Sequence, residues 1–183
     1  KKFDIPIFVG KSLSETGGTY IMKKNSALEE KLVTGISITK DILVTTILNM
    51  PYSAEKIAAV FKAVDECGLN INMITQNISK TKTAELSFSC KISEKYLLEQ
   101  VVEKVKGISQ EAVVEYKDGL AMISVVGGGM INNSGIAGRF FSALSRAGVD
   151  FYQVTTSEIS ISCSIDREFV EKAVAAAAEE FSL

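Results

Sequence analysis

The sequence predicts an α+β fold made of two similar units, and three observations lead to this prediction. Two stretches share one pattern, "SAEKIAAVFKAVDECGLNINMITQ" from Ser53 and "SGIAGRFFSALSRAGVDFYQVTT" from Ser134. A β-branched strand, "DILVTTIL" or "LAMISVV", precedes each copy, and an alternating strand, "LSFSCKIS" or "ISISCSID", follows it. Such self-similarity indicates a repeated supersecondary unit. With one more strand, each unit would form a split βαβ arrangement, in which four antiparallel strands carry two helices on one face.

The first helix of each unit is predicted from its two ends. Each copy begins at a serine, Ser53 or Ser134, whose side chain can accept a hydrogen bond from the free amides of a helix start. Apolar residues then recur at helical spacing. Both helices end at a glycine, Gly68 or Gly148, where a left-handed residue is needed. The second helix of each unit is predicted at residues 93–105 and 166–181, after the alternating strand.

The fourth strand decides how the two units are connected. In the first copy, "EAVVEYK" at 111–117 supplies it, whereas the second copy has no strand after its last helix. An earlier strand, "LVTGISIT" at 32–39, is spare. Because an open sheet edge invites aggregation, we infer that this strand crosses over to complete the second unit. The first unit is then an insertion within the second.

The predicted domain boundaries follow from this insertion. The first unit covers residues 41–118, and the second covers residues 32–40 together with 119–183. Residues 1–31 contain "IPIFVGKSLSETGGTYI", which predicts a strand, a Gly/Ser-rich loop and a short strand. We expect this segment to be the border of something upstream.

Composition excludes several classes of partner. The 183 residues allow one large domain or two small ones. Twenty Lys plus Arg against 22 Asp plus Glu give a net charge of −2 without a block of like charge, so neither nucleic acid nor a membrane surface is expected. No apolar run reaches the roughly 18 to 20 residues that a membrane span needs. The start, "KKFDIPIFVG", is not a secretion signal, and a cytoplasmic location is expected.

The cysteines and the missing histidines limit the chemistry further. Cys67, Cys90 and Cys163 are odd in number, far apart and set in apolar runs, which predicts buried thiols rather than disulfides or a metal site. The chain has no histidine, the commonest general base and metal ligand. A serine hydrolase is therefore excluded, because no histidine can activate a serine.

The run of glycines at 127–129 leaves three interpretations open. A dinucleotide fingerprint would need a glycine where Asn132 stands, and a P-loop would need a lysine that this loop lacks. A flexible connection whose glycines let two backbones approach closely is a second interpretation. The third is that the free amides and positive dipole end of the helix start receive a carboxylate.

Polar residues near the following strand support the third interpretation, a carboxylate bound at the helix start. These groups can hold an ammonium or hydroxyl, so each unit has the parts of a site for a zwitterion such as a free amino acid. Glu158 could instead be catalytic, although a carboxylate without a base or metal partner is more often structural or ligand-holding. The polar residues are Asn70, Asn72 and Gln76 in the first unit and Thr156, Ser157 and Glu158 in the second.

Three stretches of the sequence resemble a known family. The stretches "VTGISITKDILVTTIL", "GLNINMITQNIS" and "GVDFYQVTTSEISISCSI" resemble the carboxy-terminal regulatory region of aspartate kinases, which is made of two ACT units. The most specific pieces are T-S-E-I-S at 156–160 and Q-N-I-S at 76–79. "IPIFV" followed by "GGTYI" resembles the border with the kinase domain. The resemblance implies two ferredoxin-like ACT units, the first inserted into the second.

The resemblance also implies a function. The amino-terminal nucleotide motif of the kinase domain is absent, so these residues are not expected to phosphorylate aspartate themselves. They would bind lysine, threonine or both and inhibit aspartate phosphorylation in lysine, threonine and methionine biosynthesis. No catalytic residue, metal or cofactor is expected here, since ATP and Mg²⁺ would belong to the kinase domain. That domain, or a separate catalytic subunit, is an expected partner. A homodimer through the ACT units is expected because each unit is small and its pocket needs a second wall.

Three alternatives stay open. The chain can be a free-standing amino-acid sensor without a kinase, or a natural small regulatory subunit. It can also be a nucleotide-dependent enzyme that uses the Gly127–Gly129 loop.

The resemblance implies a set of effector-binding residues. In the family, effector sites lie where ACT units of different chains pack side by side, and they use the strand-to-helix loop and the following strand. Two departures leave the effector of the first site open: "PYSAEK" replaces a frequent Pro-Gly pair, and Asn72 replaces a frequent aspartate. The implied residues are Met50, Ser53, Ala54, Asn70, Ile71, Asn72 and Gln76 in the first unit, and Ile131, Asn132, Asn133, Ser134, Gly135, Ile136, Ser157 and Glu158 in the second.

Overall fold

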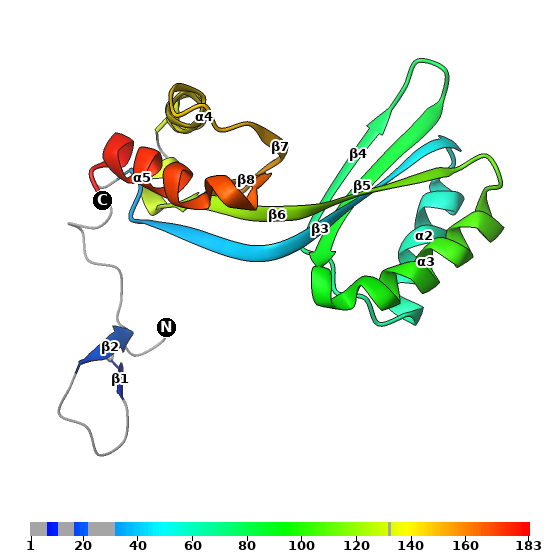
Figure 1. Cartoon of the computed structure of the whole chain (residues 1–183), viewed down its shortest axis with the longest axis horizontal. Helices are drawn as coiled ribbons and strands as arrows, with labels where there is room; N and C mark the ends of the chain where they lie inside the picture. Colours follow the sequence, from blue (N-terminus) through cyan, green and yellow to red (C-terminus); the bar gives the residue numbers. More distant parts are fainter. Residues whose placement is uncertain (1–6, 11–16, 22–31, 132) are drawn as a thin grey trace.

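The computed structural model describes residues 7–10, 17–21, 32–131 and 133–183. Within these residues, the main body is a six-stranded antiparallel sheet with the order β4-β5-β3-β6-β8-β7 and four α-helices (Figure 1). None of the helices in the described ranges is long and apolar enough to cross a membrane. The strands of this sheet are β3 (Gly35–Pro51), β4 (Met73–Ile78), β5 (Thr83–Lys91), β6 (Val113–Val126), β7 (Phe151–Thr156) and β8 (Ser160–Asp166). The helices are α2 (Ala54–Glu66), α3 (Lys95–Ile108), α4 (Ile136–Arg146) and α5 (Val170–Phe181).

Shorter elements complete the described structure. The predicted border segment contains β1 (Ile7–Gly10) and β2 (Gly18–Ile21), which pair with each other as a separate two-stranded sheet. The 3-10 helices are η1 (Ile92–Glu94), η2 (Gly128–Ile131) and η3 (Arg167–Phe169).

Two long strands, β3 and β6, belong to both units. Residues 35–39 of β3 pair with residues 122–126 of β6, which also pair with β8. Further along, β3 pairs with β5 on its other side. The first unit therefore has the order β4-β5-β3-β6 and the second β3-β6-β8-β7, which is the split βαβ order in both cases. The prediction of two such units, the first inserted into the second, is confirmed.

The strands at the junction are longer than predicted. The separate strands expected at 32–39 and 41–48 form the single strand β3, and those at 111–117 and 120–126 form β6. The chain bulges at the junction instead of turning, because Asp41 and Gly119 adopt positive φ angles of 60° and 69° within continuous strands. Since both strands run through, the domain boundaries at 40/41 and 118/119 stay a prediction.

The bulges explain how both units keep their apolar residues beneath helices. The pairing shifts by one residue between Thr39 and Ile42 and shifts back between Ile42 and Val44. A bulge changes which alternate residues face one side of a sheet. Accordingly, Ile38 packs with the core of the second unit, whereas Leu43, of opposite parity, packs in the core of the first.

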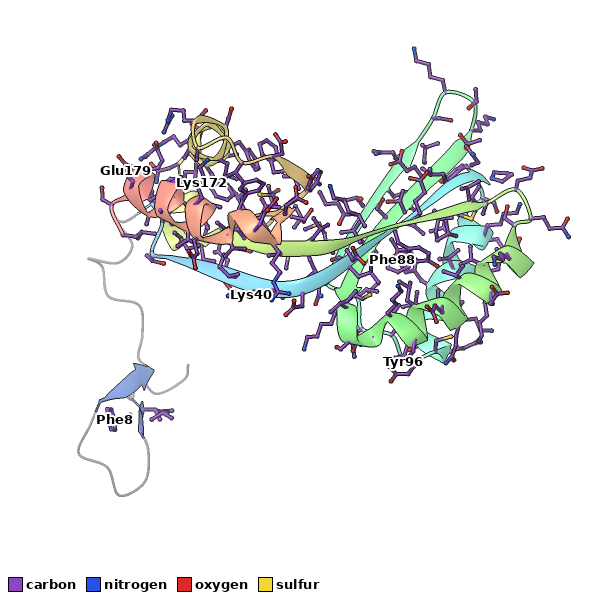
Figure 2. All side chains as sticks on the ribbon, in the orientation of Figure 1. Phe8, Lys40, Phe88, Tyr96, Lys172 and Glu179 are labelled. Carbon is purple, nitrogen blue, oxygen red and sulfur yellow. The ribbon has the colours of Figure 1, made fainter. Side chains whose placement is uncertain are left out.

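Each unit has its own hydrophobic core. Leu43, Ile47 and Phe88 pack against α2 and α3 in the first, and Phe88 is labelled in Figure 2. Ile123 and Phe140 lie in the second core, which α4 and α5 cover. The two helix pairs gather near opposite ends of the long strands (Figure 1).

The helix ends partly match the prediction. Gly68 and Gly148 have φ angles of 68° and 60° and directly follow the C-cap residues of α2 and α4, as predicted. The predicted serine caps are confirmed only for the position of Ser53. Ser53 is the N-cap residue of α2 but makes no side-chain cap hydrogen bond. In the second unit the N-cap residue is Gly135, at a φ of 85°, because the helix begins at Ile136, one residue later than Ser134 would allow.

Gly127 lies where two backbone segments meet. A Cβ atom on it would lie 2.3 Å from the carbonyl oxygen of Leu32 and 2.7 Å from the Cα of Val33. Its N–H donates to the carbonyl of Ile159 over 2.9 Å. The close-approach interpretation of this glycine is therefore confirmed.

The cysteines are free, and Cys90 and Cys163 are fully buried, as predicted, while Cys67 is half-buried. Burial raises the pKa of the Cys90 thiol to about 11 and that of the Cys163 thiol to about 12. These two thiols are therefore core groups.

Replacing Gly127 with alanine should destabilise the fold, because the new methyl group meets rigid backbone atoms of Leu32 and Val33. We expect a loss of roughly 1 to 3 kcal/mol in the free energy of unfolding, measured by urea denaturation. Gly138→Ala is the matched control, since its Cβ meets nothing within 4 Å in helix α4. It should stabilise the protein by about 0.5 to 1 kcal/mol. Equal stability of the two variants would contradict the close approach.

The buried thiols should react slowly in the native protein. At mildly alkaline pH, a thiol reagent such as DTNB should modify Cys67 quickly, and Cys90 and Cys163 only after unfolding. Because the folded state raises the pKa of both buried thiols, stability should fall as the pH rises above about 8.5, where the unfolded thiols begin to ionise. Cys67→Ser should remove the fast phase. Native modification of three thiols at one rate would contradict this assignment.

Candidate functional site

Two equivalent strand-to-helix loops hold the implied effector residues. In the first unit, the N–H of Tyr52 donates to the carbonyl of Lys82 over 2.8 Å. In the second, Gly127 donates to Ile159 in the same way. Lys82 and Ile159 belong to the β4–β5 and β7–β8 turns, so each loop is tied to the hairpin turn of its own unit.

The helix starts beside these loops have amides without a side-chain cap. The first helical hydrogen bonds run from Ile57 to Ser53 and from Arg139 to Gly135, each over 3.0 Å. Neither α2 nor α4 has a side-chain hydrogen bond at its N-cap. The amides of each first turn, together with the positive end of the helix dipole, form a surface that suits a carboxylate.

The implied residues of the first unit fall into two groups. Ser53 and Ala54 lie at the start of α2, whereas Asn70, Ile71 and Asn72 follow its other end. Helix α2 has 13 residues, so the two groups lie about 20 Å apart along its axis. A single protomer therefore does not bring them into one pocket.

Two further residues of the first unit need separate placement. The side chain of Met50 is fully buried in the core, so it does not contact a ligand, contrary to expectation. Only the main chain of Met50 borders the loop. Gln76 is exposed on β4, level with Leu86 and Ile47 on the neighbouring strands. It therefore lies nearer the loop end of the unit than Asn72 does.

The second-unit loop is more compact. Ile136 is 3% exposed and packs in the core, so its side chain is not a ligand contact, which corrects that expectation. Asn133 holds the loop closed, because its Nδ2 donates to the carbonyl of Gly129 over 2.8 Å. Asn132 lies outside the described residues. The exposed residues of this loop are Ile131, Asn133, Ser134 and Gly135.

Ser157 has a structural role that the sequence did not reveal. Its Oγ accepts a hydrogen bond from the N–H of Ser160 over 3.1 Å and lies 2.8 Å from the Ser160 hydroxyl. Ser79 does the same in the first unit, where the N–H of Thr83 donates to its Oγ over 3.1 Å. The T-S-E-I-S motif therefore forms one hairpin turn, and the Q-N-I-S motif runs from strand β4 into the other.

Glu158 is exposed on the β7–β8 turn and makes no hydrogen bond or ion pair within the described residues. It is therefore available to an ammonium group. No group of three His, Cys, Asp or Glu side chains in the described ranges is placed to hold a metal ion.

Two groups of the glycine loop are occupied by contacts within the chain. The Gly127 N–H already donates to Ile159, and the carbonyl of Gly129 accepts from Asn133. Gly129 is buried, and η2 continues the loop from Gly128. The Gly127 N–H is therefore not free to donate to a phosphate.

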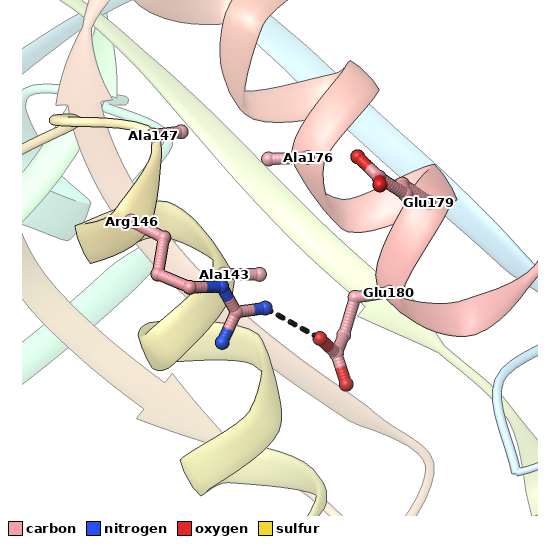
Figure 3. Close-up of a pocket in the computed structure, with 6 residues that line it drawn as sticks. All are labelled: Ala143, Arg146, Ala147, Ala176, Glu179 and Glu180. Carbon is pink, nitrogen blue, oxygen red and sulfur yellow. Dashed lines mark hydrogen bonds and ion pairs between the residues drawn. The ribbon is translucent and has the colours of Figure 1, made fainter.

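A hollow of about 410 Å³ lies between α4 and α5 (Figure 3). Small side chains, including Ala143 and Ala176, form part of its lining. Arg146 donates to Glu180 over 2.6 Å across it, and Arg139 donates to the same carboxylate over 2.7 Å. The hydrogen bonds from Arg139 and then Arg146 hold the pKa of Glu180 below its usual value. This hollow is a helix-packing groove with an ion pair across it, away from the loops.

A second hollow of about 450 Å³ lies on the sheet face opposite the helices. Strands β3 to β7 contribute to it, and Gln153 is among its lining residues. Sequence reasoning missed it, although alternate polar residues on β3, β5 and β6 mark this face.

The comparisons with known proteins agree with the geometry. Residues 123–181 match a family model described as an ACT domain. A curated relative, the aspartokinase of Geobacillus stearothermophilus, is 32% identical over 183 residues, which cover 100% of this chain and 44% of the relative. The chain thus spans less than half the length of the curated relatives it matches.

Solved structures give the same result. The ligand-free regulatory subunit of aspartate kinase from Thermus thermophilus has a TM-score of 0.74 at 25% identity, covering 82% of this chain and 99% of that one. E. coli aspartokinase III in complex with lysine and aspartate (T-state) has a TM-score of 0.74 at 22% identity, covering 98% of this chain and 40% of that one. The second likeness shows the fold alone. Over its whole length, the chain is similar to the ACT-domain regulatory regions of aspartokinases.

Proposed function

We propose that this chain is the feedback-regulatory region of an aspartokinase, which binds a free amino acid and thereby inhibits aspartate phosphorylation by a catalytic region. The observation that carries the proposal is the pair of helix starts without side-chain caps, each beside a hairpin turn. Lysine is the first candidate effector and threonine the second. Lysine is favoured because Glu158 offers a carboxylate beside the second loop, and because E. coli aspartokinase III, which shares this fold, has been solved with lysine.

The amino acid would bind by its two charged ends. Its carboxylate would accept hydrogen bonds from the amides that begin α4, near Ser134 and Gly135. Its ammonium groups would lie toward Glu158. Such a ligand can regulate only if it binds one arrangement of the chain more tightly than another.

A homodimer is part of the proposal. Within one protomer, the length of α2 separates Ser53 from Asn70 and Asn72. If a second copy placed its Asn70–Asn72 segment beside this loop, the first-unit site would gain its missing wall. ATP and Mg²⁺ would act in the catalytic region, since the glycine loop here has no P-loop lysine and its Gly127 N–H already donates to Ile159. We assign the protein to the cytoplasm, where the biosynthesis of lysine, threonine and methionine would need it.

A separate regulatory subunit is the second candidate form. The match to the Thermus thermophilus regulatory subunit, 99% of which aligns here, favours it over a free-standing sensor. Co-purification with a catalytic chain of the same organism would distinguish the two, because a free-standing sensor would have no such partner.

The proposal predicts stabilisation by an amino acid. At about 100 times its dissociation constant, lysine should add about 2.7 kcal/mol to the stability of the chain, a rise of roughly 5 to 10 °C in Tm by differential scanning fluorimetry. Cadaverine, which lacks the carboxylate, should give no shift if the helix-start amides bind that group. Threonine and ATP complete the screen. If neither lysine nor threonine moves the Tm, the amino-acid effector is wrong for this chain.

Glu158→Gln should weaken lysine binding without affecting the fold. The side chain is exposed and unpaired within the described residues, so Tm without ligand should stay unchanged. We expect a Kd for lysine at least tenfold higher by isothermal titration calorimetry, about 1.4 kcal/mol. Glu99→Gln, on the exposed face of α3, is the matched control and should bind as the parent does. An unchanged Kd in Glu158→Gln would remove this carboxylate from the site.

A further inference from the structure

A half-buried carboxylate lies behind the segment that follows helix α2. Glu94 is the last residue of η1, and its Oε1 accepts a hydrogen bond from Asn70 Nδ2 over 3.3 Å. The other carboxylate oxygen, Oε2, is buried and has no hydrogen-bond partner in the described part of the chain. Glu94 forms no ion pair with any described residue either. The Asn70–Asn72 segment is therefore backed by a negative charge that no described cation neutralises.

The hydrogen bond decides which end of the Asn70 amide faces outward. An ionised carboxylate only accepts hydrogen bonds, so it faces the NH2 group of the amide and not the amide oxygen. The Asn70 side chain is exposed, which leaves its Oδ1 as the end that a ligand can reach. An amide oxygen with a carboxylate behind it suits a hydrogen-bond donor, above all a charged ammonium group.

Glu94 acts at a distance because its charge is only partly solvated. After burial itself, the Glu94 carboxylate is the second cause that raises the pKa of the buried Cys90 thiol to about 11. Charges interact more strongly where water is excluded. Since Oε2 is inaccessible and Oε1 already accepts from Asn70, Glu94 itself does not touch a ligand. Its effect on a ligand would pass through the Asn70 amide.

The second unit places a carboxylate at the same point in a different way. Asp150 is exposed two residues after the glycine that follows α4, which is the place of Asn70 after α2. The last residue of η3 is Phe169, which packs against the second core, whereas η1 ends with Glu94. Each unit thus has one negative charge after its first helix, direct in the second unit and behind a neutral amide in the first.

We propose that Glu94 is a positioning residue of the first-unit effector site, where it turns the Asn70 amide oxygen toward the α-ammonium group of a bound amino acid. The inference rests on the proposed function and its homodimer. The carboxylate of the amino acid lies at the start of α2 in one copy, and its ammonium group meets the Asn70–Asn72 segment of the second copy. Ligands without an α-ammonium group gain nothing from Glu94.

A cycle of two protein variants and two ligands tests this role. Glu158→Gln is the background, because it weakens lysine binding in the second unit. The ligands are L-threonine and L-lysine, each compared with its analogue in which a hydroxyl replaces the α-ammonium group. Adding Glu94→Met should weaken binding of the amino acid roughly tenfold or more by isothermal titration calorimetry. Binding of the hydroxy analogue should stay within about twofold, since an uncharged hydroxyl can donate to or accept from either end of the amide.

Three controls separate positioning from folding. Without ligand, Glu94→Met should leave the Tm unchanged or higher, because it removes a buried oxygen that has no partner. In an Asn70→Ala protein, Glu94→Met should cost no further affinity, since the amide through which it acts is gone. Glu168→Met, at an exposed position of η3 in the second unit, should change neither ligand.

The outcomes distinguish this role from the proposed function. Equal weakening of amino acid and analogue, an unchanged Kd, or a full further loss in the Asn70→Ala protein overturns the role of Glu94 and leaves the regulatory function standing. If the parent binds lysine or threonine but Glu158→Gln binds neither, the first-unit site is wrong, and the role of Glu94 fails with it. A parent that binds no amino acid overturns both proposals.

Discussion

The structure depends on two strands that run through both units. Because β3 pairs with β6 along nearly its whole length, neither unit has a complete sheet without the other's strand. Paired bulges at Asp41 and Gly119 keep the strands in register while changing the side-chain alternation. Each unit can thus place alternate apolar residues beneath its own helices. A movement of β3 or β6 in one unit would therefore also move the same strand in the other unit.

The same topology positions the candidate effector loops. Each loop leaves a central strand, is tied by a backbone hydrogen bond to the neighbouring hairpin turn, and enters a helix whose start has no side-chain cap. Ser79 and Ser157 stabilise those turns with their hydroxyls. The turn serines therefore fix the shape of the turns, and Glu158 is an exposed carboxylate on the β7–β8 turn.

The two faces of the sheet serve different purposes. One face carries the helices and the two hydrophobic cores, which set most of the stability. The open face has a small apolar cluster of Ile42, Val44 and Leu120, and charged and hydroxyl side chains around it. Because the sheet curls, this face becomes a hollow between the units, and Arg167 pairs with Asp41 at the same junction.

By itself, the sequence determined the local elements and the order of the units. Local structure depends on neighbouring residues, and the spacing of apolar residues along the sequence indicates it directly. This made it possible to predict the repeat, the alternating strands and the helix ends at Gly68 and Gly148. The spare strand at 32–39 also revealed the insertion, because the strand count of one unit was short. The ACT resemblance then indicated which loops could bind an effector, but not which of their side chains are exposed to a ligand.

Only the tertiary structure decided what those residues can contact. Met50 and Ile136 belong to the cores, and Asn70 and Asn72 lie at the far end of α2 from Ser53. The Asn70 amide meets the Glu94 carboxylate, 24 positions away, only because β4 and β5 pair in a particular register between them. Register arises from pairing between distant residues, which a single sequence does not record.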